Sequence, residues 1–451
     1  MTVPFILLFG FFFILLSIKL FKKVLNPLSL YTIIWTFLLS AYELKLIRYN
    51  DLTLTTWAVV IFAHLAFTLG VITFFTARKN FGVKTNVFEE KKSFQLNIFR
   101  DNGKTVKFFI ILFSIIGILA AIQHWMVLIK EFGSIVAVLI KSAVVYRMRV
   151  QGEIKGVIPY VFSFTYVATF LAALYAGYYN KFKLFMLLPF IAMVLKSLAE
   201  VARASMLFGI VIFFLTYVLM RYLKSKDVND TTKLNRKKII LSFTVIFTLV
   251  VLSAALVKTF RAPAENYKAS TKELRQLENG FLISPSLYLY ASAHVGVLNA
   301  YLKKQDELTD FGQNTFLPVY RFLAKFKLIP QPSYYQKGYF VPVWTNTGTY
   351  LREIHADFGP VGLFLIPYLL GLISTFYWFR FFETHSLYYM AGLLFILVII
   401  TFTFLVMVTR LSYWFISLVL ILLTLKFIDK LFSINSSEEE IFLPKSSVPN
   451  Q

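Results

Sequence analysis

Long uncharged apolar runs recur along nearly the whole chain. About eleven segments of roughly 17 to 22 mostly apolar residues can be read from the sequence, each long enough to cross about 30 Å of hydrocarbon. They lie near residues 3–18, 28–43, 54–76, 108–129, 157–178, 184–200, 205–221, 239–257, 359–379, 387–409 and 411–428. Backbone in lipid must satisfy its own hydrogen bonds, so runs of this length predict helices. We therefore expect an all-α, polytopic integral membrane protein.

The composition supports this prediction. Of the 451 residues, 58% are hydrophobic and only 15% are charged, whereas a soluble globular chain carries about a quarter charged residues. The net charge is +23, but the charges stand between apolar runs and cannot form one polyanion-binding face, so we expect no nucleic-acid partner. With no Cys, no nucleotide-binding motif and no HExxH spacing among the five His, we also expect neither a cofactor nor a metal.

Lys and Arg gather in alternate loops. If the N-terminus lies outside, the segments 19–27, 77–107, 179–183, 222–238, 380–386 and 429–451 lie inside and hold about half of all Lys and Arg. The positive-inside rule then predicts a cytoplasmic C-terminus. The first apolar run has no basic segment before it and no small-residue cleavage site, so we interpret it as a retained helix.

These assignments divide the chain into four parts. Residues 1–257 carry helices one to eight, residues 258–358 form a large outer loop, residues 359–428 carry helices nine to eleven, and residues 429–451 form a cytoplasmic tail. The apolar middle of the loop, 281–301, has helical periodicity and is predicted to lie in the membrane interface as an amphipathic helix. A loop of this length in a compact protein is usually functional or disordered, and its aromatic content favours function.

The densest polar cluster stands just before the ninth apolar run. It consists of Arg352, Glu353, His355 and Asp357. Gly359, Pro360 and Gly362 follow and predict a hinge into the next helix. For Asp357 alone, a cap on that helix is an equally good interpretation, with Pro360 in the first turn.

Five arginines are predicted near the outer surface: Arg147, Arg203, Arg261, Arg352 and Arg410. A guanidinium fork binds phosphate through two parallel hydrogen bonds, so a converging set would suit a lipid-linked pyrophosphate. Each arginine alone could equally be an interfacial anchor. Tyr350 and the tyrosines before it could stack on sugar rings, although aromatic side chains also line membrane interfaces in general.

Short motifs late in the chain resemble those of the Wzy-type oligosaccharide repeat unit polymerases. The first group comprises Tyr288, Tyr290, His294, Asn299, Gly312, Thr315, Phe316 and Pro318, and the second comprises Asn346, Thr349, Tyr350, Asp357, Phe358, Gly359 and Gly362. Earlier, Arg203-Ala-Ser at the start of a run is similar to a turn of that family, and Asn26-Pro27 followed by Trp35 fits its beginning. The likeness in layout covers nearly the whole chain.

The resemblance implies a glycosyltransferase with a multi-span fold of the GT-C kind in the bacterial plasma membrane. Such enzymes transfer a growing glycan from undecaprenyl pyrophosphate onto a newly flipped lipid-linked repeat unit at the outer face, without nucleotide sugars. The implied partners are undecaprenyl-pyrophosphate-linked oligosaccharides, the lipid bilayer, a flippase and a chain-length regulator. The product would be an O-antigen, a capsule or an exopolysaccharide.

This reaction needs cations beside the leaving pyrophosphate and a base for the attacking hydroxyl. The arginines are the candidates for substrate binding, and His355, Glu353 and Asp357 are the candidates for the base. We prefer His355, because a neutral imidazole accepts a proton without help.

Three other classes of protein remain as alternatives. One is a non-enzymatic scaffold, which would leave the polar cluster in 346–362 without a purpose. A ligase that moves a finished glycan from the same carrier would share the topology and the arginines. A flippase or other transporter would instead place ionisable groups and broken helices near the middle of the membrane, where these apolar runs have few.

Overall fold

The computed structural model of the chain describes residues 2–46, 49–81, 96–151, 153–200, 204–225, 227, 285–307, 309–333, 336–341 and 344–442. These residues are mostly helical, which confirms the prediction of an all-α membrane protein. Within these described ranges, five helices are long and apolar enough to cross a membrane: α1 (Thr2–Phe21), α3 (Leu54–Asn80), α4 (Lys104–Phe132), α9 (Ala204–Lys224) and α14 (Tyr350–Thr384). The count of about eleven spans stays a prediction, and run 239–257 lies outside the described residues.

Other helices account for most of the remaining predicted runs. The remaining α-helices are α2 (Pro27–Glu43), α5 (Ile135–Ile140), α6 (Ser142–Gln151), α7 (Ser163–Tyr179), α8 (Leu188–Glu200), α12 (Pro285–Lys304), α13 (Leu317–Lys325), α15 (Leu387–Phe402) and α16 (Ser412–Phe442). The part of the chain that the structure describes also has 3-10 turns η1 (Asn97–Phe99), η2 (Leu184–Leu187) and η4 (Val408–Arg410). Strands β1 (Tyr339–Phe340) and β2 (Trp344–Thr345) pair antiparallel in a small hairpin.

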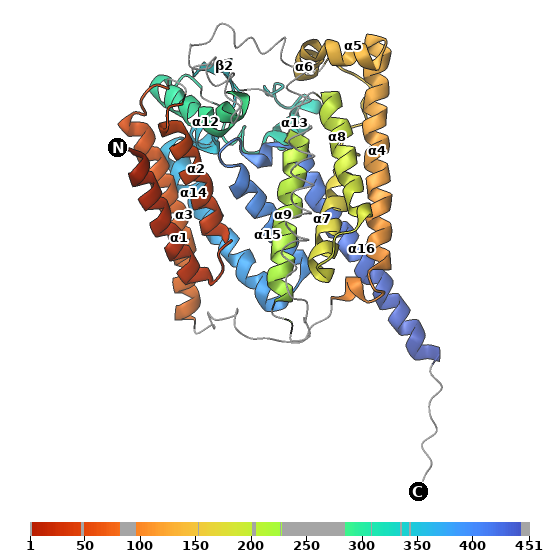
Figure 1. Cartoon of the computed structure of the whole chain (residues 1–451). Coiled ribbons are helices and arrows are strands. Elements are labelled where there is room, and N and C mark those ends of the chain that lie inside the picture. The colour runs from red at the N-terminus through yellow and green to blue at the C-terminus, as the bar shows by residue number, and fades with distance from the viewer. Residues whose placement is uncertain are drawn as a thin grey trace. The chain divides into compact units, whose positions relative to one another are not determined.

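The chain folds into two compact units that do not follow its linear order (Figure 1). The first unit comprises Met1–Phe88, Leu139–Glu153 and Val257–Phe415, and the second comprises Glu89–Val138, Ile154–Leu256 and Ile416–Gln451. The four consecutive parts expected from the sequence therefore differ from the packing units, because distant helices pair in space.

The first unit is organised around the pairing of α3 with α14, where two glycines let the backbones touch. A Cβ added at Gly70 would lie 2.1 Å from the Tyr368 carbonyl oxygen, and one added at Gly371 would lie 2.1 Å from the Phe67 carbonyl oxygen. Small residues at a crossing permit such close approach between membrane helices. The two glycines thus make one reciprocal contact.

Helices α3 and α14 run in the same direction. Phe62 of α3 contacts Phe364 of α14, and further along both helices Arg78 pairs with Glu383 near their ends. Helix α1 also runs parallel to α3, since Phe9 contacts His64 and Phe21 contacts Phe75. All three helices therefore begin on one side of the unit.

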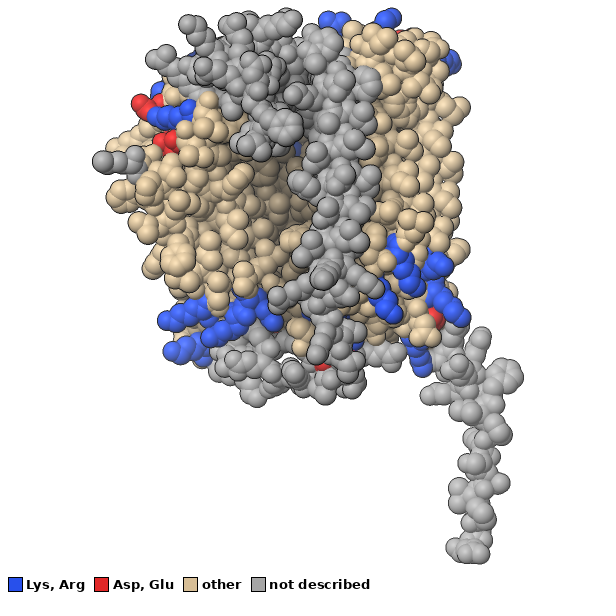
Figure 2. All heavy atoms as spheres, viewed as in Figure 1, with Lys and Arg blue, Asp and Glu red and all other residues tan. Residues whose placement is uncertain are grey.

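Basic residues mark the opposite side of this unit. Lys19 lies in the last turn of α1, and Arg78 and Lys79 lie in the last turn of α3. Figure 2 shows Lys and Arg side chains gathered at the lower end of these helices. The side on which α14 begins is thus opposite to the basic side.

Two features of the large loop can be compared with the predictions. Segment 285–304 is helical, but α12 packs against α2 and its side chains Val295, Val297 and Tyr301 are fully buried. Protein thus encloses α12, and a position of this helix in the membrane interface stays a prediction. Helix α13 is amphipathic and exposes Val319 and Phe322.

The hinge predicted before the ninth run is confirmed. Gly359 interrupts α14 with φ 61° and ψ −154°, a conformation open almost only to glycine. Pro360 follows and lacks the N–H that a continuous helix would use. The last helix is longer than expected. Helix α16 extends from Ser412 through Phe442, whereas the last apolar run was expected to end at residue 428.

The second unit is a bundle of α4, α7, α8 and α9. Helix α7 is buried along almost its whole length, and the α4 glycine Gly117 would place a Cβ 2.0 Å from Thr165 Oγ1. Lys196 and Glu200 form the i, i+4 pair that their spacing predicts, with Nζ and Oε1 3.5 Å apart.

Candidate functional site

The candidate site lies at the start of α14 and is built by four segments of the first unit. The first turn of α14 is met by the segment after α12, by the β1–β2 hairpin and by η4. Thr349 precedes the helix with extended φ and ψ angles, and the Tyr350 amide donates to the Thr403 carbonyl at 2.9 Å. This bond fixes the start of α14 against the end of α15.

Arg352 is the centre of the site and is only 1% exposed. Its Nη2 donates to both carboxylate oxygens of Glu307, at 2.7 and 2.6 Å, and Nη1 donates to the Asn346 carbonyl at 3.1 Å. Its Cζ lies 5.1 Å from the centre of the Tyr339 ring. A buried guanidinium is tolerated only when paired in this way.

Glu353 forms a second ion pair beside that of Arg352 and is also only 1% exposed. Its carboxylate pairs with the guanidinium of Arg410 and accepts a hydrogen bond from the Met407 amide. Gln336 Nε2 donates to the same carboxylate at 2.5 Å. Glu353 therefore joins α14 to η4 and to the segment before β1.

Charges within this network balance. Arg352 pairs with Glu307 and Arg410 pairs with Glu353, so two cations face two anions. Each guanidinium is thus already paired with a carboxylate. We therefore interpret this ionic network, defined as Arg352, Glu307, Glu353 and Arg410, as the frame that holds the site in shape.

His355 is the titratable group of the cluster that is open to a ligand. It is half-buried, and its Nδ1 lies 2.8 Å from the hydroxyl of Tyr301. Burial raises the pKa of Tyr301 to about 12, so its hydroxyl stays neutral at physiological pH. The tyrosine ring also meets the imidazole edge-on, with 5.6 Å between ring centres.

Asp357 is committed to the loop that follows α12. Oδ1 accepts from Thr309 Oγ1 at 2.6 Å and from the amide and side chain of Asn314 at 2.9 and 3.0 Å. Oδ2 accepts from the amide and hydroxyl of Thr315 at 2.7 and 2.8 Å. The cap interpretation is therefore wrong, because both oxygens bind residues 309–315. Five hydrogen bonds also leave this carboxylate little capacity to act as a base.

Asp306 is a further acidic residue, and it lies beside the ionic network. The Tyr339 hydroxyl lies within hydrogen-bond distance of Asp306 Oδ1 at 2.6 Å and of Glu307 Oε1 at 2.5 Å. Lys337 Nζ donates to Asp306 at 2.5 Å. These hydrogen bonds, first from Lys337 and then from Tyr339, hold the pKa of Asp306 below its ordinary value.

The other predicted residues are spread more widely. Tyr350 is completely buried and its hydroxyl lies 2.8 Å from that of Tyr31, so it packs the helices and does not face a ligand. Arg147 is exposed on α6. Arg203 and Arg261 lie outside the described residues. Of the five arginines, the structure thus brings Arg352 and Arg410 into one network.

Sequence reasoning missed the partners of this network. Glu307 lies 45 positions before Arg352, Tyr301 lies 54 before His355, and Gln336 lies 17 before Glu353. Their roles, and that of Tyr339 beside Glu307, depend on the return of the loop onto α14. The acidic pair Asp306-Glu307 directly after an apolar helix was the available signal. A buried arginine needs an acidic partner, and these two residues are the acidic pair nearest before Arg352 in the outer loop.

No cluster of three or more His, Asp or Glu side chains suited to a metal ion occurs in the described part of the chain. Comparisons with protein-family models, with curated proteins and with solved structures gave no match for this chain.

Proposed function

We propose that this protein polymerises lipid-linked oligosaccharide repeat units into a surface polysaccharide at the outer face of a bacterial plasma membrane. The observation that carries the proposal is the half-buried His355, held by the buried Tyr301 hydroxyl at 2.8 Å, within a fixed ionic network at the start of a membrane-length helix. Such a site can bring a base to a substrate whose lipid lies in the bilayer.

The proposed reaction transfers a glycan from undecaprenyl pyrophosphate to a sugar hydroxyl. The hydroxyl oxygen attacks the anomeric carbon, the bond from that carbon to the pyrophosphate oxygen breaks, and undecaprenyl pyrophosphate leaves with the bonding electrons. His355 Nε2 takes the hydroxyl proton. This role requires the tautomer in which Nδ1 carries hydrogen and donates to Tyr301.

Roles for the acidic and basic residues follow from their contacts. Arg352 and Glu353, each 1% exposed, are positioning residues that fix the first turn of α14 and thereby the place of His355. Exposed Arg147 is the candidate for direct contact with pyrophosphate, because a guanidinium fork fits phosphate oxygens. Arg203 and Arg261 remain predictions for the same role.

Orientation is part of the proposal. The network lies where α1, α3 and α14 begin, and the basic residues Lys19, Arg78 and Lys79 lie where α1 and α3 end. Since basic residues favour the cytoplasmic side, this arrangement supports an extracytoplasmic site. It also supports a transferase over a transporter, for which ionisable groups near the middle of the membrane are typical.

The test is to delete the gene in its native host and complement it with variants. Lipid-linked glycans and surface polysaccharide are then separated by size. We expect wild type to restore long polymer, and His355→Asn to leave single repeat units at an unchanged protein level in the membrane. His385→Asn is the matched control, because His385 ends the same helix with φ 54°, a conformation that Asn tolerates.

Other outcomes assign other functions. Long polymer that accumulates on the lipid carrier in the deletion strain would identify a ligase. Repeat units trapped on the inner face would identify a transporter. Wild-type polymer from His355→Asn would remove His355 from the reaction.

A further inference from the structure

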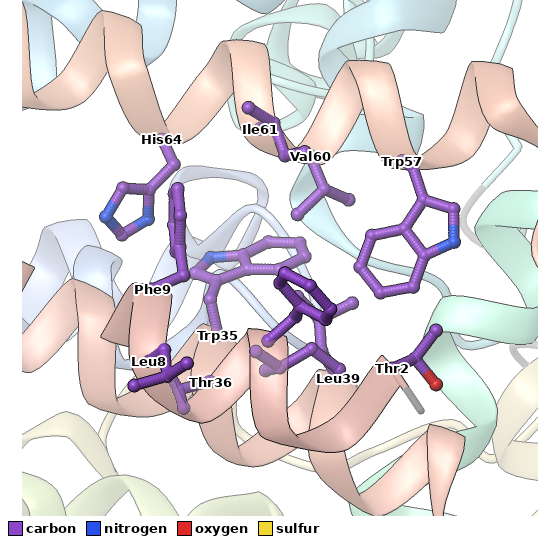
Figure 3. Close-up of a pocket in the computed structure, with 12 residues that line it drawn as sticks. Thr2, Leu8, Phe9, Trp35, Thr36, Leu39, Trp57, Val60, Ile61 and His64 are labelled. Carbon is purple, nitrogen blue, oxygen red and sulfur yellow. The ribbon is translucent and has the colours of Figure 1, made fainter. Parts of the chain in front are cut away.

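A cavity of about 530 Å³ lies between α1, α2 and α3 of the first unit (Figure 3). Its size falls within the range of roughly 300 to 1,000 Å³ that is typical of small-molecule sites. Twelve described residues line it: Thr2, Phe5, Ile6, Leu8, Phe9, Trp35, Thr36, Leu39, Trp57, Val60, Ile61 and His64. The proposed glycan transfer uses none of them.

The chemistry of the lining selects an apolar occupant. No Lys, Arg, Asp or Glu stands among the twelve lining residues, and most are aliphatic or aromatic. A water molecule needs two to four polar partners to be held in a cavity, and these walls offer few. Helices α1 and α3 are each long and apolar enough to cross a membrane, so hydrocarbon is the available apolar ligand.

The two ends of the cavity differ. Thr2 and Trp57 lie at one end and His64 lies at the other (Figure 3). Thr2 begins α1 and donates to Glu43 Oε2 at 2.8 Å, and Trp57 stands in the first turn of α3. Tryptophan is enriched at the level of lipid headgroups. The cavity therefore starts at the interface and runs into the apolar interior.

The cavity also has an outward-facing rim. Phe5 and Leu8 on α1 are 75% and 65% exposed, and Ile61 on α3 is 41% exposed. The inner wall is different, since Leu39 is 8% exposed and Val60 is 4% exposed. A hydrocarbon chain that enters the cavity past this rim would leave the surrounding lipid and contact side chains that bulk lipid does not reach.

We propose that this cavity binds one acyl chain of a bilayer phospholipid. The acidic side chain at the polar end decides between lipid classes. A polyprenyl phosphate would place its anionic group next to the chain and close to Glu43, where like charges repel. A phospholipid places neutral ester carbonyls there, next to the Thr2 hydroxyl and the Trp57 indole.

The bound acyl chain would contact Trp35, which packs against the residues that hold the start of α14. Trp35 lines the cavity, and its ring centre lies 6.1 Å from that of Tyr31 and 6.2 Å from that of Tyr350. The hydroxyls of Tyr31 and Tyr350 are 2.8 Å apart. Tyr350 is the first residue of α14, two positions before Arg352, so the lipid is a structural part of the first unit.

Crosslinking tests the proposal on the full chain. The protein is reconstituted in vesicles of phosphatidylcholine that carries a diazirine on one acyl chain, irradiated, and mapped by peptide mass spectrometry. We expect label on the buried wall at Leu39 and Val60. Label confined to outward-facing Phe5 and Leu8 would overturn the proposal, and this result does not depend on any variant.

A matched pair of variants sharpens the test. Ile61→Trp fills the cavity, whereas Leu65→Trp adds the same ring one turn away on α3, at a residue that is 48% exposed and does not line the cavity. We expect Ile61→Trp to reduce label at Leu39 at least fivefold and Leu65→Trp to leave it unchanged. Equal label in both variants, or displacement of the label by an equimolar polyprenyl phosphate, would overturn the proposal.

Discussion

The Tyr301 hydroxyl lies 2.8 Å from His355 Nδ1, although 54 positions separate the two residues. Tyr301 is fully buried in α12, and His355 is half-buried in α14. A rigid, neutral partner therefore fixes the orientation of the imidazole ring. This pair links the packing of the loop to the chemistry proposed for the site.

Tyr301→Phe is expected to slow polymer formation while the fold persists. The substitution removes one hydrogen bond, which contributes about 0.5 to 1.5 kcal/mol, and this corresponds to a rate loss of roughly 2- to 10-fold. The rate is measured in membranes supplied with lipid-linked repeat units. Tyr320→Phe, which removes the exposed hydroxyl bond to the Phe311 carbonyl, serves as control. Equal rates in the two variants would show that His355 needs no such support.

Glu353→Gln is expected to destabilise the protein strongly. The buried Arg410 would lose its paired carboxylate, and breaking a buried ion pair from one side costs about 3 to 5 kcal/mol. Thermal unfolding of the purified protein in detergent measures the loss. Glu131→Gln on the exposed end of α4 is the control and should leave the unfolding temperature unchanged. An unfolding temperature for Glu353→Gln equal to that of wild type would contradict the buried pair.

Asp357→Asn is expected to release the segment 309–315. The new amide would place a donor against donors of Asn314 or Thr315, and each unsatisfied buried group costs about 1 to 3 kcal/mol. Hydrogen exchange at the Thr315 amide should become faster. Asp310→Asn, at an exposed neighbour, is the control. Unchanged exchange at Thr315 would mean that the carboxylate does not hold the loop.

Gly70→Leu is expected to separate α3 from α14. The first added carbon would lie 2.1 Å from the Tyr368 carbonyl oxygen, and overpacking of this kind costs about 1 to 3 kcal/mol or more. The unfolding temperature in detergent should fall. Ala58→Leu places the same side chain on an exposed position of α3 and should have little effect. A fall of the same size in both variants would argue against the close glycine contact.

The fold class could be predicted because hydrocarbon imposes a single local rule, helix formation, on each apolar run. The same rule says nothing about which helices pair. The close approach of α3 and α14 depends on two glycines, Gly70 and Gly371, about 300 positions apart, and no local pattern encodes it. The packing units therefore could not be predicted as consecutive segments.

The candidate site could be predicted only where its residues are close together in the sequence. The cluster from Arg352 to Asp357 is local and visible in the sequence, as is the glycine that breaks α14 at position 359. Its partners Glu307 and Tyr301 reach it only through loop closure. Periodicity shows that a helix is amphipathic, but it does not show whether protein or lipid covers the apolar face. The packing of α12, in the segment 281–301, against α2 therefore could not be predicted.

The pairing of α3 with α14 sets an order of events during biosynthesis. Helix α3 ends at Asn80 and its partner α14 begins at Tyr350. Helix α3 therefore stays in the membrane without its partner while the intervening chain, including the bundle of α4, α7, α8 and α9, is synthesised. That bundle is complete before the first unit can close. A chain that stops before Tyr350 would thus carry a complete bundle of α4, α7, α8 and α9, whereas α3 would lack its partner and Gly70 would face lipid.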